Sequence, residues 1–453
     1  MLPNFSLQDL LAKHDFDHLN DMQTKVLEHF PSQDEIILLS NTGSGKTLAF
    51  LLAILQQIQP NQHHTQALII APSRELAMQI DEVFRKLNTK LKVCLCYGGH
   101  KREIEENNLL VEPVLIIGTA GRLADHIRRG SIRTEKIECL VLDEFDKSIE
   151  LGFLEEIEFI ISSLPTLRKK ILCSATAAKS IPEGIQVKNP FELNFIVEDE
   201  TASNKDLEIV KFLSPEQDKI NTLFKLLCYA KNHPAIVFCN HRDAIERVAF
   251  LMAEKGIECA CYHGGMEQHE RESELAMFRN GTMRVLITTD LGARGLDIPG
   301  IRYILHYHLP LTEDSFTHRN GRTARMFDFG TAIILLAPDE ELPSFVNQDI
   351  KLLNIPDTFI LPEESPWITL HFSIGKKDKV NKIDIVGFLS HIGALKKDDI
   401  GLIEVKDFFA FAAIRRKKLK QTLNNIQDEK IKGKKVKINE AKLYIDSIHQ
   451  SDI

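Results

Sequence analysis

Short, almost continuously apolar runs alternate with helix-like segments from the N-terminus to about residue 340. Such runs are typical of parallel strands that helices cover on both faces, because neither face carries a regular row of polar side chains. A first set of strands is predicted at 35–40, 67–72, 92–97, 114–119, 139–144 and 170–175. A second set is predicted at 235–240, 258–264, 284–290, 303–309 and 331–337. The pattern therefore predicts two similar α/β domains in succession.

Two interruptions suggest where the domains end. Residues 198–205 are polar and are interpreted as a linker, and three prolines interrupt residues 356–367. After the prolines, the pattern predicts strand, helix, two paired strands (the second at 408–414), helix and a final strand at 434–441, an order that suits a small ferredoxin-like sandwich. The predicted domains are 1–198, 206–355 and 366–441.

Charge is unevenly divided along the chain, whose net charge is −8. Residues 366–453 contain 18 Lys and Arg against 11 Asp and Glu, which is +7; the other 38 basic and 53 acidic residues give −15. A basic segment on an acidic body predicts a localised polyanion site, with a merely solvated charged surface as the alternative. No apolar run reaches the ~20 residues of a membrane span and no secretory signal is visible, so we expect a cytoplasmic protein without membrane attachment.

The cysteines favour packing over metal binding. Cys94 and Cys96, like Cys259 and Cys261, are two residues apart, so each pair lies on one face of its predicted strand. Neither pair has the Cys-x-x-Cys or paired-histidine spacing of a zinc site. We therefore predict buried, reduced thiols.

The segment SNTGSGKT at 40–47 lies between a predicted strand and an apolar helix. In this position its backbone N–H groups can surround phosphate oxygens at a helix N-terminus. Lys46 would reach the β and γ phosphates, and Thr47 would hold Mg²⁺. The predicted phosphate-binding residues are Thr42, Gly43, Ser44, Gly45, Lys46 and Thr47.

Two further motifs complete a hydrolytic site. DEFD at 143–146 follows a buried strand, where Asp143 is the natural Mg²⁺ partner and Glu144 can orient and deprotonate a water. HRNGRTAR at 318–325 contains Arg322 and Arg325, which would share one face of a helix. These arginines would stabilise charge on the γ-phosphate, so hydrolysis would require the two domains to close. The alternative for HRNGRTAR is a charged surface helix.

In the order of these motifs, residues 5–340 resemble a DEAD-box RNA helicase. PSRELA at 72–77, Gly98-Gly99, TAGR at 119–122, SAT at 174–176 and TTDLGARGLDIP at 288–299 complete the match. The resemblance implies ATP and Mg²⁺ as cofactors and RNA as partner. It implies RNA contacts by Pro72, Arg74, Gly99, Thr119, Arg122 and Thr289; adenine contacts by Phe16 and Gln23; a ribose contact by Asp297; and coupling of the two sites by Asp146, Ser174, Thr176 and Arg294.

The chain departs from the family pattern at several positions. Asp15-Phe16 and Leu19-Asn20-Asp21 replace the Gly-Phe and Pro-Thr-Pro that usually precede the adenine-reading glutamine. Phe145 replaces the alanine of DEAD, and Asn320 stands where isoleucine is common. None of these changes removes a phosphate, metal or arginine-finger residue, so we expect catalysis to be retained.

Residues 366–441 resemble the RNA-binding module of DbpA-type DEAD-box proteins, a divergent RNA-recognition-motif fold. The matching patches are GKKDKVNKIDIVGFL and KIKGKKVKI. In FFAFAAI, Phe409 and Phe411 would lie on one strand face and Phe408 on the other, and core packing explains them at least as well as base stacking. Phosphate contacts are instead predicted for Lys376, Lys377, Arg415, Arg416, Lys434 and Lys435.

The sequence thus predicts two tandem RecA-like parallel-sheet domains plus a small C-terminal α+β domain like an RNA-recognition motif. The expected function is ATP-dependent, local unwinding of structured RNA by a monomer, with ribosomal RNA in large-subunit assembly implied by the resemblance. An ATP-gated RNA clamp or assembly scaffold remains as the alternative, because clamp and helicase both need closure on RNA. A DNA helicase is disfavoured by the resemblance of the TAGR and PSRELA loops.

Overall fold

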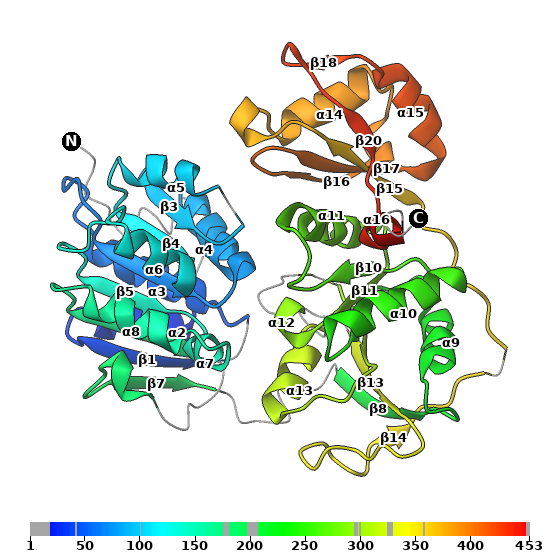
Figure 1. Ribbon diagram of the computed structural model, residues 1–453, viewed down its shortest axis with the longest axis horizontal. Helices are drawn as coiled ribbons and strands as arrows, with labels where there is room; N and C mark the ends of the chain where they lie inside the picture. Colours follow the sequence, from blue (N-terminus) through cyan, green and yellow to red (C-terminus); the bar gives the residue numbers. More distant parts are fainter. Residues whose placement is uncertain are drawn as a thin grey trace. The chain divides into compact units, whose positions relative to one another are not determined.

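The computed structural model describes residues 19–40, 43–99, 101–174, 181–196, 207–293, 298, 300–323, 329–356 and 358–449. Six predicted site residues lie outside these ranges: Phe16, Thr42, Thr176, Arg294, Asp297 and Arg325. The chain forms two compact units, the first holding the N-terminal domain and the second holding both the second α/β domain and the C-terminal domain (Figure 1). Within the described ranges, no helix has the length and apolarity needed to cross a membrane.

The N-terminal domain is a parallel sheet with the strand order β3-β4-β2-β5-β6-β1-β7. Its strands are β1 (Glu35–Ser40), β2 (Ala67–Ala71), β3 (Val93–Cys96), β4 (Leu115–Thr119), β5 (Cys139–Leu142), β6 (Lys169–Ser174) and β7 (Phe191–Phe195). Its helices are α2 (Asp21–His29), α3 (Lys46–Gln57), α4 (Arg74–Lys86), α5 (Arg102–Leu109), α6 (Ala120–Arg128), α7 (Phe145–Glu150) and α8 (Leu154–Ser162), with a 3₁₀ turn at Glu183–Ile185.

Both faces of this sheet are buried, which confirms the reason for the continuously apolar runs. On β1, Ile36 and Leu38 belong to the hydrophobic cluster that includes α3, whereas Ile37 and Leu39 belong to the cluster beneath α6 and α8. Successive strand residues point to opposite faces, so a strand between two helical layers needs apolar side chains at every position. Only the edge strand β7 is largely uncovered, and the apolar pattern did not predict it.

The second domain repeats this architecture with a parallel sheet in the order β10-β11-β9-β12-β13-β8-β14. The strands are β8 (Leu207–Leu213), β9 (Ala235–Phe238), β10 (Ala260–Tyr262), β11 (Val285–Thr288), β12 (Tyr303–His306), β13 (Gly330–Leu336) and β14 (Lys351–Leu352). The helices are α9 (Ile220–Ala230), α10 (Arg242–Glu254), α11 (Gln268–Arg279), α12 (Asp290–Ala293) and α13 (Glu313–Asn320). The five predicted strands are confirmed, while β8 and β14 were not predicted.

The C-terminal domain has an antiparallel sheet in the order β16-β17-β15-β20, and the predicted βαββαβ succession is confirmed. Its elements are β15 (Trp367–Phe372), a 3₁₀ turn at Lys376–Asp378, α14 (Lys382–His391), a 3₁₀ turn at Lys397–Asp399, β16 (Ile400–Val405), β17 (Ala410–Arg415), a 3₁₀ turn at Arg416–Lys418, α15 (Leu419–Ile426), β18 (Lys430–Ile431), β19 (Lys434–Lys435), β20 (Ile438–Glu440) and α16 (Tyr444–His449). The final strand predicted at 434–441 is present as β20, but it begins four residues later than predicted, because 434–435 instead pair with β18 in a separate hairpin.

Candidate functional site

The phosphate loop connects β1 to α3, as predicted. Gly43 and Gly45 have φ angles of 84° and 92°, in the left-handed region that glycine adopts without steric cost. Lys46 begins α3, is buried, and donates from Nζ to the backbone carbonyl of Ser40. The loop therefore presents its backbone N–H groups at a helix N-terminus, the arrangement that binds phosphate.

A capping box lies before this loop at the start of α2, and the sequence patterns did not predict it. The side chain of Asn20 accepts from the backbone N–H of Gln23, and the side chain of Gln23 accepts from the N–H of Asn20. Asn20 Nδ2 also donates to the carbonyl of Ser44 (2.9 Å), and Gln23 Nε2 donates to that of Gly45 (3.3 Å). The Asn-x-x-Gln spacing could have revealed this cap. Gln23 thus supports the phosphate loop, and its contact with adenine stays a prediction.

Asp143 and Glu144 follow β5 at the carboxyl edge of the sheet. Burial and then the charge of Glu144 raise the pKa of Asp143 to about 7, while Lys46 opposes the increase. The N–H of Glu144 donates to Asp143 Oδ1 (3.1 Å), and Glu144 has the unusual φ of 45°. A buried carboxylate with incomplete neutralisation is suited to a divalent cation, so the residues present fit Mg²⁺. Phe145 is buried in the core, which explains how the extra bulk is accommodated.

The strand order places nucleotide and RNA candidates on one edge of the same sheet. The phosphate loop, Ser174 and Asp143 follow or end β1, β6 and β5, three consecutive strands of the sheet. The RNA candidates follow β2, β4 and β3, the next three strands. In parallel sheets, ligands bind at the carboxyl ends of the strands. The carboxyl edge of this sheet therefore has two halves. The nucleotide candidates follow β1, β6 and β5, and the RNA candidates follow β2, β4 and β3.

The predicted RNA-contacting residues of the first domain come together in the structure. Arg74 starts α4, and its guanidinium lies against Gly98 and Gly99, where a Cβ on Gly99 would come within 2.5 Å of Arg74 Nη1. Arg122 in α6 donates from Nε to the carbonyl of Tyr97 (3.2 Å). Pro72 and Thr119 follow or end the adjacent strands β2 and β4.

In the second domain, Arg319 makes buried structural contacts. Its side chain is fully buried, donates to both carboxylate oxygens of Asp290 (2.5 and 2.7 Å), and also contacts Asn240 Oδ1 (2.9 Å) and the carbonyl of His308 (2.7 Å). Because Asp290 follows Thr289, Arg319 ties two of the sequence motifs together. Thr289 Oγ1 itself accepts the N–H of Gly292 (3.1 Å).

One prediction about the second domain is wrong. Arg322 and Arg325 were expected on one helix face, but α13 ends at Asn320 and Gly321 caps it. Thr323, two residues after Gly321, donates from its hydroxyl to the carbonyl of Ile301. Arg322 therefore lies in a turn, with its N–H donating to the carbonyl of Arg319 (3.1 Å). Asn320, which replaces the usual isoleucine, is bonded to the buried His306 (2.9 Å).

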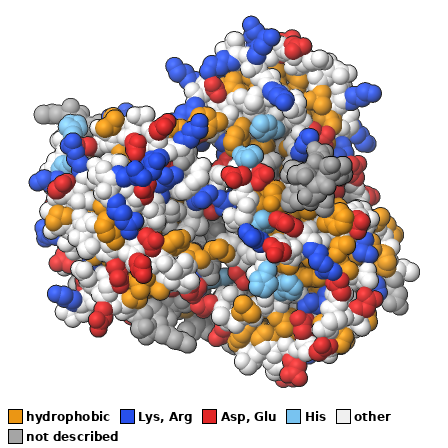
Figure 2. All heavy atoms as spheres, in the orientation of Figure 1, with side chains coloured by type: hydrophobic (Ala, Val, Ile, Leu, Met, Phe, Trp, Pro, Cys, Tyr) orange, Lys and Arg blue, Asp and Glu red, His pale blue; other side chains and the backbone are white. Residues whose placement is uncertain are grey.

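Six lysines lie around one end of the C-terminal domain, and we call them the lysine rim: Lys376, Lys377, Lys379, Lys432, Lys434 and Lys435. All six are exposed, and Figure 2 shows lysine and arginine side chains spread around the outer part of this domain. Two of the six are paired with acidic groups, Lys434 with Asp378 (2.6 Å) and Lys432 with Asp384 (2.7 Å).

Arg415 and Arg416, also predicted to bind RNA, make internal contacts. Arg415 lies 4.0 Å from the ring centroid of Trp367 and donates to the carbonyl of Asp398 (3.2 Å). Arg416 pairs with Glu364 (2.9 Å) and donates to the carbonyl of Ser365 (2.8 Å). Both arginines are half-buried. Their RNA contacts stay a prediction, and the lysine rim is the more accessible basic surface.

The outer face of the C-terminal sheet packs on the second domain. On β15, Leu370 and Phe372 face the domain core, while Thr369 on the other face lies 2.8 Å from Thr282 and accepts from Asn280 (2.8 Å). Glu404 on β16 pairs with Arg279 at the end of α11 (3.6 Å). This face is therefore used for an internal contact.

The rings of Phe409 and Phe411 pack together, as predicted, but the strand of FFAFAAI begins later than predicted. Phe408 and Phe409 precede β17, so the strand predicted from 408 begins two residues too early. Phe411 is 1% exposed, and its ring packs with those of His371 and Phe409 (both 5.4 Å between centroids). Packing therefore explains Phe411 better than a base-stacking platform does.

The C-terminal segment returns to the second domain. The N–H of Tyr444 donates to Glu274 Oε1 (2.6 Å), whose other oxygen accepts from the N–H of Cys261 (2.7 Å). Tyr444 also donates from its hydroxyl to Glu246 (3.2 Å), and its ring lies edge-on to His263 (5.6 Å). Figure 1 shows α16 next to β10. Both ends of the C-terminal domain are thus attached to the second domain.

All eight cysteines are buried and free, as predicted. The side chains of Cys96, Glu105 and His126 do converge on one point in the N-terminal domain, with possible ligand atoms within 4.8 Å of one another. The sequence spacing gave no sign of this cluster.

Comparison with known proteins agrees with this geometry. Three family models match in succession: DEAD/DEAH box helicase over residues 20–183, helicase conserved C-terminal domain over 218–327, and DbpA RNA binding domain over 369–440. The ATP-dependent RNA helicase DbpA of Escherichia coli (strain K12) is 31% identical over 455 residues, covering 96% of this chain and 98% of the relative. That of Bacillus subtilis (strain 168) is 28% identical over 452 residues, covering 93% and 94%.

A solved structure supports the fold of the two α/β domains. Saccharomyces cerevisiae Dbp5 bound to RNA and ADP BeF3 superposes with a TM-score of 0.63 at 28% identity, over 74% of this chain and 87% of that chain.

Proposed function

The chain belongs to the DEAD-box family of ATP-dependent RNA helicases and carries a DbpA-type RNA-binding domain. We propose that it remodels structured RNA locally and that its substrate is ribosomal RNA of the assembling large subunit. The observation that carries the proposal is the lysine rim, an accessible basic surface in a domain attached to the second helicase domain. Clustered lysines bind phosphates without reading sequence, so RNA shape would select the substrate.

The proposed chemistry assigns a role to each group at the nucleotide half of the sheet edge. The phosphate loop and Lys46 bind the phosphates, and Thr47 and Asp143 hold Mg²⁺, which neutralises charge on the phosphates when bound. Glu144 orients a water and accepts its proton. Arg322 and Arg325 stabilise charge that develops on the γ-phosphate, which makes hydrolysis depend on closure of the second domain.

RNA binding is proposed for the other half of the edge and for Thr289. Arg74, Gly99, Thr119 and Arg122 would hold one strand by its backbone in the first domain. Because the C-terminal domain is anchored by contacts at Thr369 and Tyr444, it would travel with the second domain as one body. The C-terminal domain would therefore set where on an RNA the second domain closes.

A helicase and an ATP-gated clamp are distinguished by strand displacement. We expect the purified protein to release a short labelled strand from a duplex next to a structured RNA, with ATP but not without it. ATP-dependent binding without release would favour the clamp.

The choice of substrate is tested by changing the lysine rim. We expect Lys434→Ala with Lys435→Ala to weaken binding of a ribosomal RNA fragment and to reduce its crosslinking in cells. Lys396→Ala with Lys397→Ala is the matched control, because it removes the same charge from another exposed turn of the domain. Equal loss in both variants would contradict a specific role for the rim.

We also propose that the protein acts as a monomer in the cytoplasm. Light scattering during size-exclusion chromatography, with and without RNA, tests the monomer, and a fluorescent fusion tests the compartment.

A further inference from the structure

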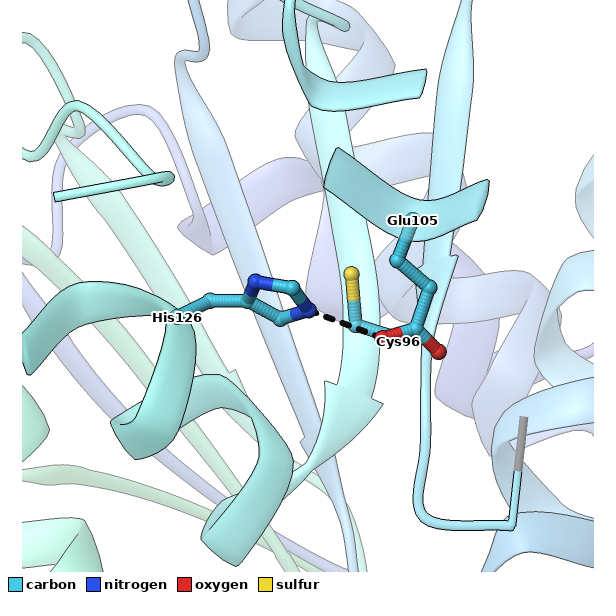
Figure 3. Close-up of side chains that lie close together, drawn as sticks. All are labelled: Cys96, Glu105 and His126. Atoms are coloured by element: carbon cyan, nitrogen blue, oxygen red, sulfur yellow. Dashed lines mark hydrogen bonds and ion pairs between the residues drawn. The ribbon is translucent and has the colours of Figure 1, made fainter. Parts of the chain in front are cut away.

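Glu105 is a buried carboxylate on an otherwise solvent-facing helix. Its side chain is completely inaccessible, and only Glu105 and Leu109 of α5 are buried. Figure 3 shows the Glu105 carboxylate meeting the His126 imidazole of α6 beside Cys96 of β3. A buried charge is costly unless partners compensate it, so its partners indicate its role.

The partners belong to the segments that carry the RNA candidates. Glu105 Oε1 accepts the N–H of Tyr97, the residue before Gly98-Gly99 (3.1 Å). Glu105 Oε2 lies 2.8 Å from His126 Nε2 and 3.3 Å from Arg122 Nε. The same Arg122 nitrogen donates to the carbonyl of Tyr97 (3.2 Å). One carboxylate thus joins the glycine loop after β3 to the arginine of TAGR.

The same cluster has the composition of a metal site, but its charges favour an ion pair. The guanidinium of Arg122 already neutralises the oxygen that a cation would need. Cys94 and burial raise the pKa of the Cys96 thiol well above its ordinary value, so a thiolate ligand is disfavoured.

We propose that Glu105 is a positioning residue, which fixes the side chain of Arg122 and the Gly98-Gly99 loop in the orientation that binds RNA. The proposal rests on the RNA contact assigned to Arg122 in the proposed function. The Arg122 side chain keeps 15% of its surface exposed, while its Nε lies 3.3 Å from Glu105 Oε2 and donates to the carbonyl of Tyr97. Without Glu105, the arginine would lose its fixed rotamer and its buried counter-charge.

The test compares Glu105→Gln with Glu103→Gln, an exposed carboxylate on the same helix. RNA-stimulated ATPase activity is measured against RNA concentration and, separately, against ATP concentration. We expect E105Q to raise the RNA concentration for half-maximal stimulation roughly tenfold. The KM for ATP should stay unchanged, and E103Q should match the wild type. Thermal unfolding of both variants shows whether the domain remains folded.

A double-mutant cycle separates positioning from a general structural effect. Because Glu105 also holds the glycine loop through the N–H of Tyr97, E105Q should raise the half-maximal RNA concentration less in the Arg122→Ala background than in the wild type. Additive effects, or an equal change in the KM for ATP, would overturn the proposal. Elemental analysis provides a further test. If the wild type contains one equivalent of zinc and E105Q contains none, the cluster is a metal centre and the proposal is overturned.

The controls also distinguish this inference from the proposed function. A wild-type protein that RNA stimulates, together with an E105Q variant that behaves identically, would refute the role of Glu105 alone. A wild-type protein that RNA does not stimulate would refute the proposed function and, with it, any role of Glu105 in RNA binding.

Discussion

Glu274 offers a quantitative test of how the C-terminal segment is attached. Burial raises the pKa of this carboxyl to about 8 from an ordinary value of 4.5, although the N–H groups of Tyr444 and Cys261 partly oppose the increase. The folded protein therefore keeps the proton between about pH 4.5 and 8, whereas the unfolded chain releases it. Stability from this group is present at low pH and is lost as the pH rises through this window.

The size of the effect follows from the linkage of one proton. Inside the window the free energy of unfolding should fall by about 1.4 kcal/mol per pH unit because of Glu274. Glu274→Gln cannot titrate, so it should lack this contribution. The melting temperature of the variant minus that of the wild type should therefore rise with pH. For a compact folding unit of this length, the rise should be roughly 3 to 6 °C for each pH unit.

The assay is thermal unfolding at several pH values from 5.5 to about 7.5, the range in which this carboxyl titrates only on unfolding. Glu272→Gln on the same helix is the control, because its carboxylate is only partly buried and bonds to Gln268 rather than to the C-terminal segment. Its difference from the wild type should be constant across the range. If the E274Q difference is equally flat, Glu274 is ionised in the folded protein and the reasoning about its burial is refuted.

Four further changes test the remaining assignments. Glu144→Gln should lower ATP turnover by roughly 100-fold or more while ATP still binds, which fluorescent-nucleotide titration can measure. Arg322→Ala should lower turnover by about 10³ with little change in ATP affinity, because its charge acts on the transition state. Arg319→Ala should instead destabilise the second domain by about 3 kcal/mol, since it leaves Asp290 unpaired. Asn20→Ala should cost about 1 kcal/mol of stability and raise the KM for ATP through the phosphate loop.

Each of these results has a contrary outcome. Substantial turnover by E144Q or R322A would remove the base or finger role from that residue. An R319A variant that melts like the wild type but hydrolyses ATP slowly would make Arg319 a catalytic arginine rather than a structural residue. An N20A variant with lower stability and an unchanged KM for ATP would limit Asn20 to capping α2.

Periodicity predicted the helicase domains well because a parallel sheet between two helical layers needs apolar side chains on both faces. Ile36 to Leu39 supply both hydrophobic clusters and therefore read as one unbroken run. Strands at or near an edge do not have this requirement. β7 and β8 alternate partly exposed and buried positions, and no apolar run predicted them.

Motifs predicted the phosphate loop and the acidic pair, because their chemistry depends on neighbours within a few residues. They failed where a residue's role depends on a distant partner. Arg319 and Arg322 belong to the same motif, yet Asp290 and Asn240 give the first buried structural contacts. Similarly, Glu105 carries no motif of its own, and Thr369 acquires its role from Thr282 in another domain.

The strand order also bears on how the nucleotide and RNA sites communicate. β5 pairs directly with β2, and the N–H of Asp143 donates to the carbonyl of Ile70 (2.9 Å). Ile70 is two residues before Pro72, so the proposed Mg²⁺ partner and the first RNA loop are joined by one backbone hydrogen bond. A buried sheet of this kind holds its strands at fixed spacing. The nucleotide and RNA candidates of the first domain therefore belong to one continuous sheet. On the proposed mechanism, the step that depends on ATP is the approach of Arg322 and Thr289 with the second domain.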